Sequence, residues 1–349
     1  MERLEIEREV RRLSPWYYLY DLDGVRTDLL PPCDRHGHRA VSLTGSGPFL
    51  AGRSVLDVGC NEGGYSFAAL DNGAAHVTGI DVRPVNVEKA RFVARVKGRT
   101  KAEFYLASCD EWLARDPEPV DVVFLCGLLY HLVEPWKTIE QYCALAREGV
   151  FVTCVLAGGP DGYTPFPEQE NIAASADPAL VSQMPNTSRT IVEEFEKHGF
   201  LPRYIAESRS EFFWGGCWLF LQNCNEWRGR WSKSPQAGEE VDLYLTPHPR
   251  RSPSSESRKV EVVLYNRGAR ARELARSAHA YGADGSHLHA LGPERLVLPA
   301  RVASPEDRMS ESVSVTLDLA SLPPETSSVQ VLVHDPERGT VVASGKLLV

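Results

Sequence analysis

The stretch SVLDVGCNEGGYS, residues 54–66, decides the fold of this chain. An apolar run leads through Asp57 into a turn with spaced glycines, and a helical pattern follows. A second apolar run, residues 77–80, ends in Asp81. A strand, a glycine turn, a helix and a strand that ends in an acid form a nucleotide-binding βαβ unit. In such a unit the glycines let the backbone approach the ligand, and the carboxylate accepts ribose hydroxyls.

The composition of the turn indicates which nucleotide suits it. A dinucleotide turn reads G-x-G-x-x-G and sets a pyrophosphate against a helix N-terminus. Here the turn holds two acids, Asp57 and Glu62, and residues 57–63 contain no Lys, Arg, Ser or Thr. Acids repel a pyrophosphate, whereas they suit a ligand with a cationic amino-acid end and a neutral adenosine end. A βαβ turn without a ligand is the alternative.

Residues 57–63 resemble motif I of class I S-adenosylmethionine-dependent methyltransferases, [DE]-x-G-x-G-x-G, with Asn61 at the middle glycine position. The resemblance implies S-adenosylmethionine as the cofactor. It assigns cofactor binding to two groups of residues, Asp57, Gly59, Asn61 and Gly63 in the turn, and Asp81 and Val82 after the second strand. It also assigns the adenine amino group to Asp110 after the third strand, where a helix N-cap is the alternative.

The segment CGLLYHLVEP, residues 126–135, is similar to the G-V-L-Y-H-x-x-[DE]-P segment of one methyltransferase branch. That branch includes bacterial enzymes that carboxymethylate a tRNA wobble uridine, together with many small-molecule methyltransferases. The resemblance spans about residues 14–225 and places Cys126 at the cofactor, with Tyr130 and His131 facing the methyl donor as catalytic residues. His131 can accept a proton from an attacking nucleophile near neutral pH. Packing under the cofactor is the alternative role.

Two segments are candidates for the acceptor site. The aromatic segment near residue 16 supplies Trp16, Tyr17 and Tyr20, which can attract a sulfonium through cation–π contacts, and Arg26 follows it. Core packing of at least two of the segment's aromatic rings is the alternative. Asn186 and Arg189 precede a helix in a region that lines the acceptor pocket of many class I enzymes; a helix cap with a solvated arginine is the alternative. Arg26, Lys89 and Arg91 are possible partners for the extra carboxylate of a carboxylated donor.

Composition narrows the class of protein. The chain has 349 residues and a formal net charge of −9, which disfavours a nucleic-acid partner. No apolar run is long enough to span a membrane, and the charged N-terminus is unlike a signal peptide. Its eight cysteines form no C-x-x-C pair, which fits free thiols in the cytoplasm. We therefore expect a cytoplasmic protein with a small-molecule or carrier-bound acceptor, and the oligomeric state stays open.

No metal site is predicted. Residues 31–38 hold one thiol and two imidazoles, but their spacing matches no standard site. His279, His287 and His289 lie close in sequence, where a surface strand or loop is the favoured interpretation.

The periodicity predicts an α/β fold with a C-terminal β domain. Strands alternating with helices from residue 54 imply a doubly wound, Rossmann-like, seven-stranded methyltransferase sheet. Short alternating runs separated by Gly, Asp and Pro follow residue 259 and predict an all-β, sandwich-like unit. The expected domains are an N-terminal helix with an aromatic cap segment, a methyltransferase domain, a linker and the β unit, at residues 1–50, 51–227, 228–258 and 259–349.

The sequence thus predicts a methyltransferase that uses S-adenosylmethionine and transfers a methyl group in line to a small-molecule or carrier-bound acceptor. Two alternatives remain. One is a tRNA-uridine methyl- or carboxymethyltransferase, and the other is a non-catalytic scaffold that binds the cofactor and recognises a partner through its β domain.

Overall fold

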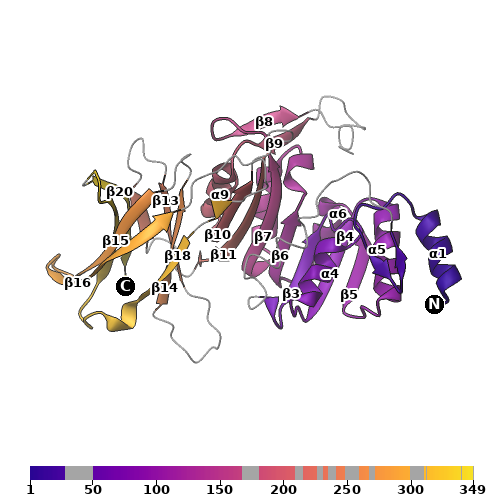
Figure 1. The fold of residues 1–349 in the computed structure, drawn as a ribbon, viewed down its shortest axis with the longest axis horizontal. Helices are drawn as coiled ribbons and strands as arrows, with labels where there is room; N and C mark the ends of the chain where they lie inside the picture. Colours follow the sequence, from indigo (N-terminus) through magenta and orange to yellow (C-terminus); the bar gives the residue numbers. More distant parts are fainter. Residues whose placement is uncertain are drawn as a thin grey trace. The chain divides into compact units, whose positions relative to one another are not determined.

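The structure is a computed structural model of the whole chain. It describes residues 1–27, 50–166, 181–208, 215–225, 231–234, 241–247, 259–266, 272–298, 310–311, 313–338 and 340–348. The chain divides into two compact units, Met1–Cys154 with Pro165–Gln183 and Val155–Thr164 with Met184–Val349. Figure 1 shows the fold coloured along the sequence, with the helices and strands labelled. The predicted domain boundaries remain a prediction, and the candidate metal segment at residues 31–38 lies outside the described residues.

A parallel sheet forms the centre of the first unit. Its strands run in the order β7-β6-β3-β4-β5, and all four neighbouring pairs are parallel. Their bounds are β3 (Ser54–Val58), β4 (His76–Asp81), β5 (Ala102–Leu106), β6 (Val120–Cys126) and β7 (Ala146–Leu156). The chain moves from β3 outward through β4 and β5, then returns to pair β6 on the other side of β3. This reversal is the switch point at which open α/β sheets bind ligands.

Short helices connect these strands, and the sequence explains where they begin. They are α4 (Gly64–Asp71), α5 (Pro84–Val96), α6 (Cys109–Leu113), the 3-10 helix η1 (Leu129–His131) and α7 (Pro135–Cys143). Prolines occupy the first position of α5 and α7, where a missing N–H costs nothing. A capping box between Ser108 and Glu111 starts α6. Asp110 is therefore not the N-cap of that helix.

The N-terminal segment packs onto the first unit through an apolar core. Helix α1 (Arg3–Arg12) buries Ile6 and Val10, and the hairpin of β1 (Asp21–Leu22) and β2 (Val25–Arg26) follows. An Asp23-Gly24 turn joins the two strands, with both of its residues at positive φ. The core that these elements share with α4, β5 and α5 is one cluster of buried residues.

The second unit begins with a helix and an antiparallel pair of strands. Helix α9 (Ser188–Lys197) is capped by Thr187, and Gly199 at φ 79° follows its last turn and closes it. Strands β10 (Phe200–Ser208) and β11 (Gly215–Asn223) pair, and β17 (Ser310–Glu311) adds to β10. A Gly-Gly pair is a turn signal in sequence, but here Gly215 and Gly216 start β11 and do not form a turn. Two further strands are β8 (Tyr163–Phe166) and β9 (Ser182–Pro185). Strands β3 to β7 with β10 and β11 are the seven that the sequence predicted.

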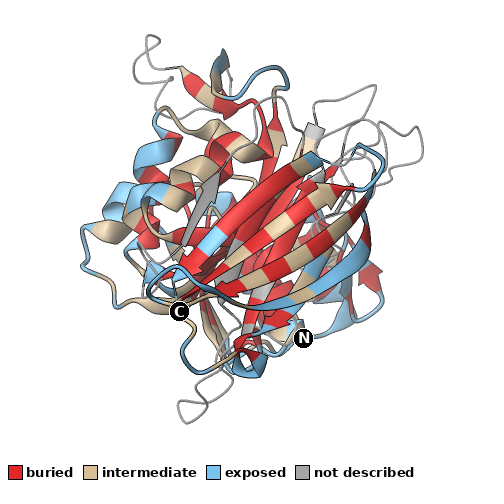
Figure 2. Cartoon of the chain, turned by 90° about the vertical axis from the view of Figure 1, so that its left-hand side faces the viewer, coloured by how far each residue is buried: buried red, intermediate tan, exposed pale blue. Residues whose placement is uncertain are grey.

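Two antiparallel sheets form a β sandwich in the second unit. One runs β12-β20-β19-β15-β16 and the other β13-β14-β18. Their bounds are β12 (Trp231–Ser234), β13 (Val241–Pro247), β14 (Lys259–Asn266), β15 (Arg272–Tyr281), β16 (His287–Leu298), β18 (Val313–Asp318), β19 (Ser328–Asp335) and β20 (Thr340–Leu348). Both sheets contribute to one apolar core, and buried residues follow the strands in Figure 2. Strands β12 and β13 lie within residues 228–258, the predicted linker, so this segment supplies one strand to each sheet.

Three histidines meet on the five-stranded sheet. His279 on β15 lies 3.3 Å from His287 on β16, ring nitrogen to ring nitrogen. Ser277 Oγ lies 3.0 Å from His279 Nε2 and 3.4 Å from His334 Nε2 on β19. Burial, His287 and His334 lower the pKa of His279. No group of three possible ligands in the described part of the chain is placed to hold a metal.

The lowered pKa of His279 makes unfolding sensitive to acid. The folded chain favours the neutral ring of His279 more than the unfolded chain does. The stabilisation that this residue gives to the folded state is therefore complete above the ordinary histidine pKa, and it is lost as pH falls below about 6.5. We expect the thermal midpoint of the wild type to fall between pH 7.5 and 5.5 more steeply than that of His279→Gln. Differential scanning fluorimetry measures both, with the exposed His289→Gln as control. Equal slopes for the wild type and His279→Gln would contradict the argument.

Candidate active site

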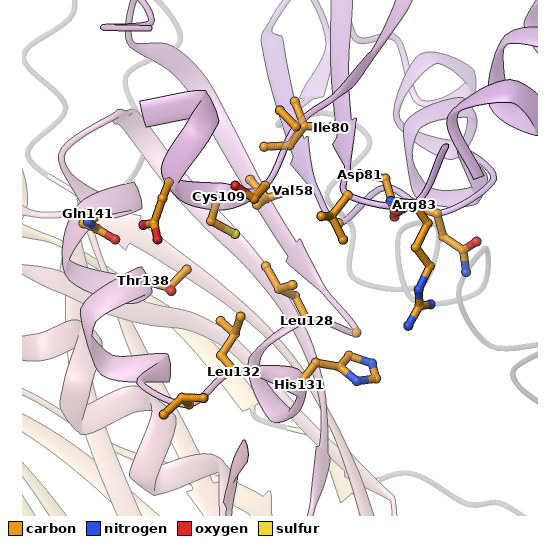
Figure 3. A pocket seen from close by; sticks show the side chains of 18 of the residues that line it. Val58, Ile80, Asp81, Arg83, Cys109, Leu128, His131, Leu132, Thr138 and Gln141 are labelled. Carbon is orange, nitrogen blue, oxygen red and sulfur yellow. Dashed lines mark hydrogen bonds between the residues drawn. The ribbon is translucent and has the colours of Figure 1, made fainter. Parts of the chain in front are cut away.

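A cavity of about 590 Å³ lies at the carboxyl ends of the parallel strands in the first unit. Its walls come from the segments after β3, β4, β5 and β6, and from η1 and α7. The size is that of a pocket for a small ligand or cofactor. Figure 3 shows Asp81, Arg83 and His131 towards one end, Thr138 and Gln141 towards the other, and Leu128 between them.

The glycine turn has an unusual backbone conformation. Gly59, Asn61 and Gly63 have φ angles of 72°, 51° and 85°, all in the left-handed region. Asn61 stands where methyltransferase motifs have their middle glycine, and asparagine is one of the few other residues that tolerate this region. Of these three residues, Gly59 and Asn61 line the cavity, and Gly63 caps α4.

Asp81 connects the turn to the next helix. Its Oδ2 accepts the N–H of Asn61 at 2.8 Å, and its Oδ1 accepts the N–H of Arg83 at 2.8 Å and the amide of Asn86 at 3.2 Å. A carboxylate offers about four acceptor positions, so these bonds orient Asp81 and leave capacity for a ligand hydroxyl. Val82 and Asn86 line the cavity beside it. Arg83 is the N-cap of α5, so Asp81 is not that cap; it bonds the start of the helix and also lines the cavity.

Asp57 is buried behind the turn. It is 1% exposed, and its Oδ2 accepts the hydroxyl of Ser66 at 2.5 Å. Its Oδ1 is buried without a hydrogen-bond partner. Burial raises the pKa of Asp57 to about 7, and the nearby Asp81 adds to the rise. A cationic donor group placed near this oxygen would stabilise the charged form. Asp57 is not itself in the cavity wall, which begins at the next residue, Val58.

The remaining predicted cofactor residues divide between the cavity and the core. Asp110 lines the cavity together with Cys109, whose pKa burial raises to about 11. Cys126 is 6% exposed and lies at the end of β6, and the adjacent Gly127 lines the cavity instead. The thiol of Cys126 is directed at Phe151 O, at 4.0 Å.

Tyr130 and His131 lie on η1, directly after β6. Their ring centroids are 4.2 Å apart at 43°, and His131 lines the cavity. The backbone around them is fixed, because His131 O accepts the hydroxyl of Ser182 at 3.1 Å and Leu132 O accepts the N–H of Gln183 at 2.8 Å. An imidazole held at the rim of the cavity can accept or relay a proton.

The N-terminal aromatic residues lie in the core rather than in the cavity wall. Trp16 is 0% exposed and donates its indole N–H to Val10 O at 2.8 Å. Tyr20 is 4% exposed and donates its hydroxyl to Glu62 O at 2.9 Å. Tyr17 is half-buried, and Arg26 is exposed on β2. Core packing, the alternative weighed for this segment, therefore describes Trp16, Tyr18 and Tyr20.

Asn186 and Arg189 belong to the second unit, where both have partners. Asn186 accepts the hydroxyl of Thr164 at 2.7 Å and donates to Pro160 O at 2.9 Å. Arg189 donates to Glu193 at 2.7 Å, and Thr187 caps the helix as the alternative expected. Their assignment to the acceptor remains a prediction.

Sequence reasoning did not name several residues of the cavity wall. These are Arg83, Asn86, Leu128, Lys137, Thr138 and Gln141. Arg83, Asn86 and Leu128 follow the ends of β4 and β6, so their position relative to the strand ends could have indicated them. The α7 residues gave no such signal, because only the tertiary fold brings them there.

Residues 50–198 match the family model described as "Methyltransferase domain". A tRNA U34 carboxymethyltransferase from Methylococcus capsulatus is 32% identical over 160 residues, 45% of this chain and 48% of that protein. A ubiquinone biosynthesis O-methyltransferase from Aromatoleum aromaticum is 36% identical over 103 residues, 29% of this chain and 42% of that protein. The chain therefore spans about half the length, or less, of these curated relatives.

Among solved structures, the N-terminal domain of EvdMO1 with SAH bound aligns with a TM-score of 0.52 at 21% identity. The alignment covers 64% of this chain and 97% of that domain. At this identity the likeness shows the fold, and the Rossmann-like methyltransferase fold with an added β domain is confirmed.

The fold, the cavity and the family match of residues 50–198 make this chain similar to the class I, S-adenosylmethionine-dependent methyltransferases. Within that class it resembles the branch of the tRNA U34 carboxymethyltransferases. These relatives stand against the expectation, drawn from net charge, that nucleic acid is not a partner. No described helix is long and apolar enough to cross a membrane.

The buried Asp57 should destabilise the fold at high pH when no donor is bound. The pKa of Asp57 in the folded chain, about 7, lies above the unfolded value of 3.8. The free energy of unfolding of the wild type therefore falls as pH rises through this interval. Asp57→Asn should raise the thermal midpoint, and the gain should be larger at pH 8 than at pH 5. Asp71→Asn, an exposed site on α4, is the control. The same gain at both pH values would refute the assignment.

Proposed function

We propose that this protein binds S-adenosylmethionine in the 590 Å³ cavity and transfers its methyl group to a small-molecule or carrier-bound acceptor. The observation that carries the proposal is Asp81, an acid at the carboxyl end of β4, held by the glycine turn and by the start of α5 at the edge of the cavity. A ribose diol is the ligand group that suits an oriented carboxylate at this position.

The residues around the cavity fit the other parts of the cofactor. Asp110 reaches the cavity from α6 and suits the adenine amino group. The backbone of Gly59 and Asn61 lines the cavity and suits the amino-acid end, and the buried carboxylate of Asp57 behind this wall adds electrostatic attraction for a cation. Val82 and Leu128 offer apolar contacts to a ring. The bound cofactor supplies a sulfonium-activated methyl group.

The chain's part in the transfer is positioning. An acceptor must lie in line with the reacting methyl group, away from water, and positioning of this kind supplies up to roughly 7–11 kcal/mol in ideal intramolecular systems. We assign this role to the η1 segment, where Tyr130 packs on His131 at the cavity rim. His131 takes the proton of an acceptor hydroxyl, amine or thiol, a role worth about 10²–10⁴ in rate.

A tRNA acceptor is the second candidate, because the named relatives modify tRNA. Two observations favour the first candidate. The net charge of −9 gives no general attraction to phosphates. In addition, Lys89 and Arg91, considered as partners for a carboxylated donor, are engaged by Glu62 at 2.8 Å and by Phe104 O at 2.6 Å.

Asp81→Ala should weaken donor binding at least tenfold, or about 1.4 kcal/mol, because it removes the oriented carboxylate. Isothermal titration with S-adenosylhomocysteine measures the effect, with Asp71→Ala, an acid that does not line the cavity, as control. Native mass spectrometry of the purified wild type shows in parallel whether a donor co-purifies. Unchanged affinity in Asp81→Ala would refute this donor site.

The acceptor class can be tested with methyl-labelled donor. We expect the label to enter the small-molecule or carrier-protein fraction of a cell extract and this transfer to be lost in His131→Ala while S-adenosylhomocysteine binding persists. Label in RNA, with transfer that weakens steeply as salt rises, would replace this acceptor with tRNA.

A further inference from the structure

The carboxylate of Glu62 is buried against the N-terminal cap, which we define as residues 1–27. Sequence reasoning placed this acid opposite a ligand, but it is 1% exposed and is not among the residues that line the cavity. Its two oxygens accept the N–H of Tyr17 at 2.9 and 3.0 Å, and one of them also accepts the N–H of Tyr18 at 3.0 Å. Both donors are backbone groups of the cap, so Glu62 fixes the path of the cap and not only a side chain.

Lys89 completes this contact from α5. Its ammonium lies 2.8 Å from Glu62 and 2.5 Å from Pro15 O, and 5.3 Å from the centroid of the Trp16 ring. Lys89 is 5% exposed, so the two charges are buried together. A buried charge that loses its partner is strongly destabilising, which makes this pair an all-or-none connection between cap, turn and α5.

The same acid belongs to the turn of the candidate active site. Glu62 lies between Asn61, which lines the cavity at φ 51°, and Gly63, which caps α4 at φ 85°. Asp81 holds Asn61 from the sheet side. Glu62 holds the next residue from the cap side. A turn with left-handed residues at alternate positions, 59, 61 and 63, depends on such external contacts, because the backbone does not favour this conformation by itself.

A second close contact between the cap and the turn is made at Gly64. A Cβ at Gly64 would lie 2.4 Å from the ring of Tyr18, closer than any real contact. The φ of Gly64 is an ordinary helical one, so alanine there would disturb the cap without straining the helix.

We propose that Glu62 and Lys89 are positioning residues that couple docking of the N-terminal cap to binding of the methyl donor. The proposal rests on the proposed function, since it concerns the same cavity. Docking of the cap holds the turn in its binding conformation. By reciprocity, a bound donor must favour the docked cap by the same factor.

The test combines donor affinity with amide exchange. S-adenosylhomocysteine affinity is measured by titration for wild type, Glu62→Gln and Gly64→Ala, after circular dichroism confirms the fold. Hydrogen exchange at the Tyr17 and Tyr18 amides is measured with and without saturating S-adenosylhomocysteine. The matched control is Glu88→Gln, which removes a 2.6 Å ion pair between Arg12 of the cap and α5 without touching the turn.

We expect Glu62→Gln and Gly64→Ala to weaken affinity at least tenfold and Glu88→Gln to change it less than twofold. In the wild type the ligand should slow exchange at the two amides by about the same factor. If Glu62 has a purely structural role, Glu62→Gln will have a lower thermal midpoint but an unchanged affinity for S-adenosylhomocysteine and unchanged ligand-induced protection. That result would overturn the proposal.

If Glu62→Gln does not fold, the affinity of Gly64→Ala and the hydrogen exchange of the wild type test the coupling instead. Absence of ligand-induced protection at Tyr17 and Tyr18 in a wild type that binds would overturn the coupling alone. A wild type that does not bind S-adenosylhomocysteine would overturn the proposed function and the coupling with it.

Discussion

The hydrogen bond from the Asn61 N–H to the carboxylate of Asp81, at 2.8 Å, is the contact on which the candidate active site depends. It joins the end of one parallel strand to the turn after its neighbour, and through Arg83 and Asn86 it also fixes the start of α5. Without it, Asn61 would be free to leave the left-handed region, and the cavity would lose the backbone that forms its base. The acid that is oriented to meet a ligand is therefore also the group that shapes the turn.

Three acids meet within this small region, and each is compensated in a different way. Asp81 receives backbone N–H groups, Glu62 has the ammonium of Lys89, and Asp57 has one serine hydroxyl and a pKa raised to about 7 by burial. Of the three, Asp57 has a buried oxygen without a partner. The carboxylate of Glu62, on the cap side, thus has partners for both oxygens, whereas that of Asp57, behind the turn, lacks a partner for one oxygen. A cationic ligand group would supply what is missing there.

Local sequence patterns predicted most of the fold because each element of the parallel sheet has its own signal. Apolar runs and the glycine turn predicted that strands alternate with helices from residue 54, as β3 to β7 and their helices do. The pair Gly215-Gly216 is a turn signal in sequence, but the structure places both glycines at the start of β11. The partner of Glu62 could not be predicted, because Tyr17 and Lys89 lie far from it in sequence and the bonds use backbone N–H groups, which carry no sequence signal. For the same reason the aromatic cap looked like a binding surface, although its rings fill a core.

The position of the cap residues changes how the site must form. A cavity built only from strand ends would be preorganised by the sheet, as Asp81 and Gly127 are. Here Glu62 of the turn is bonded to the N-terminal cap, 45 residues earlier in the sequence, and Lys89 is bonded to both. Burying an ion pair gains little net stability over an apolar contact of the same shape. The Glu62–Lys89 pair adds specificity instead. Its carboxylate, its ammonium and the two backbone N–H groups of the cap all find partners in this one arrangement of cap, turn and helix. The geometry of the turn is therefore a property of the whole first unit, and not of its motif alone.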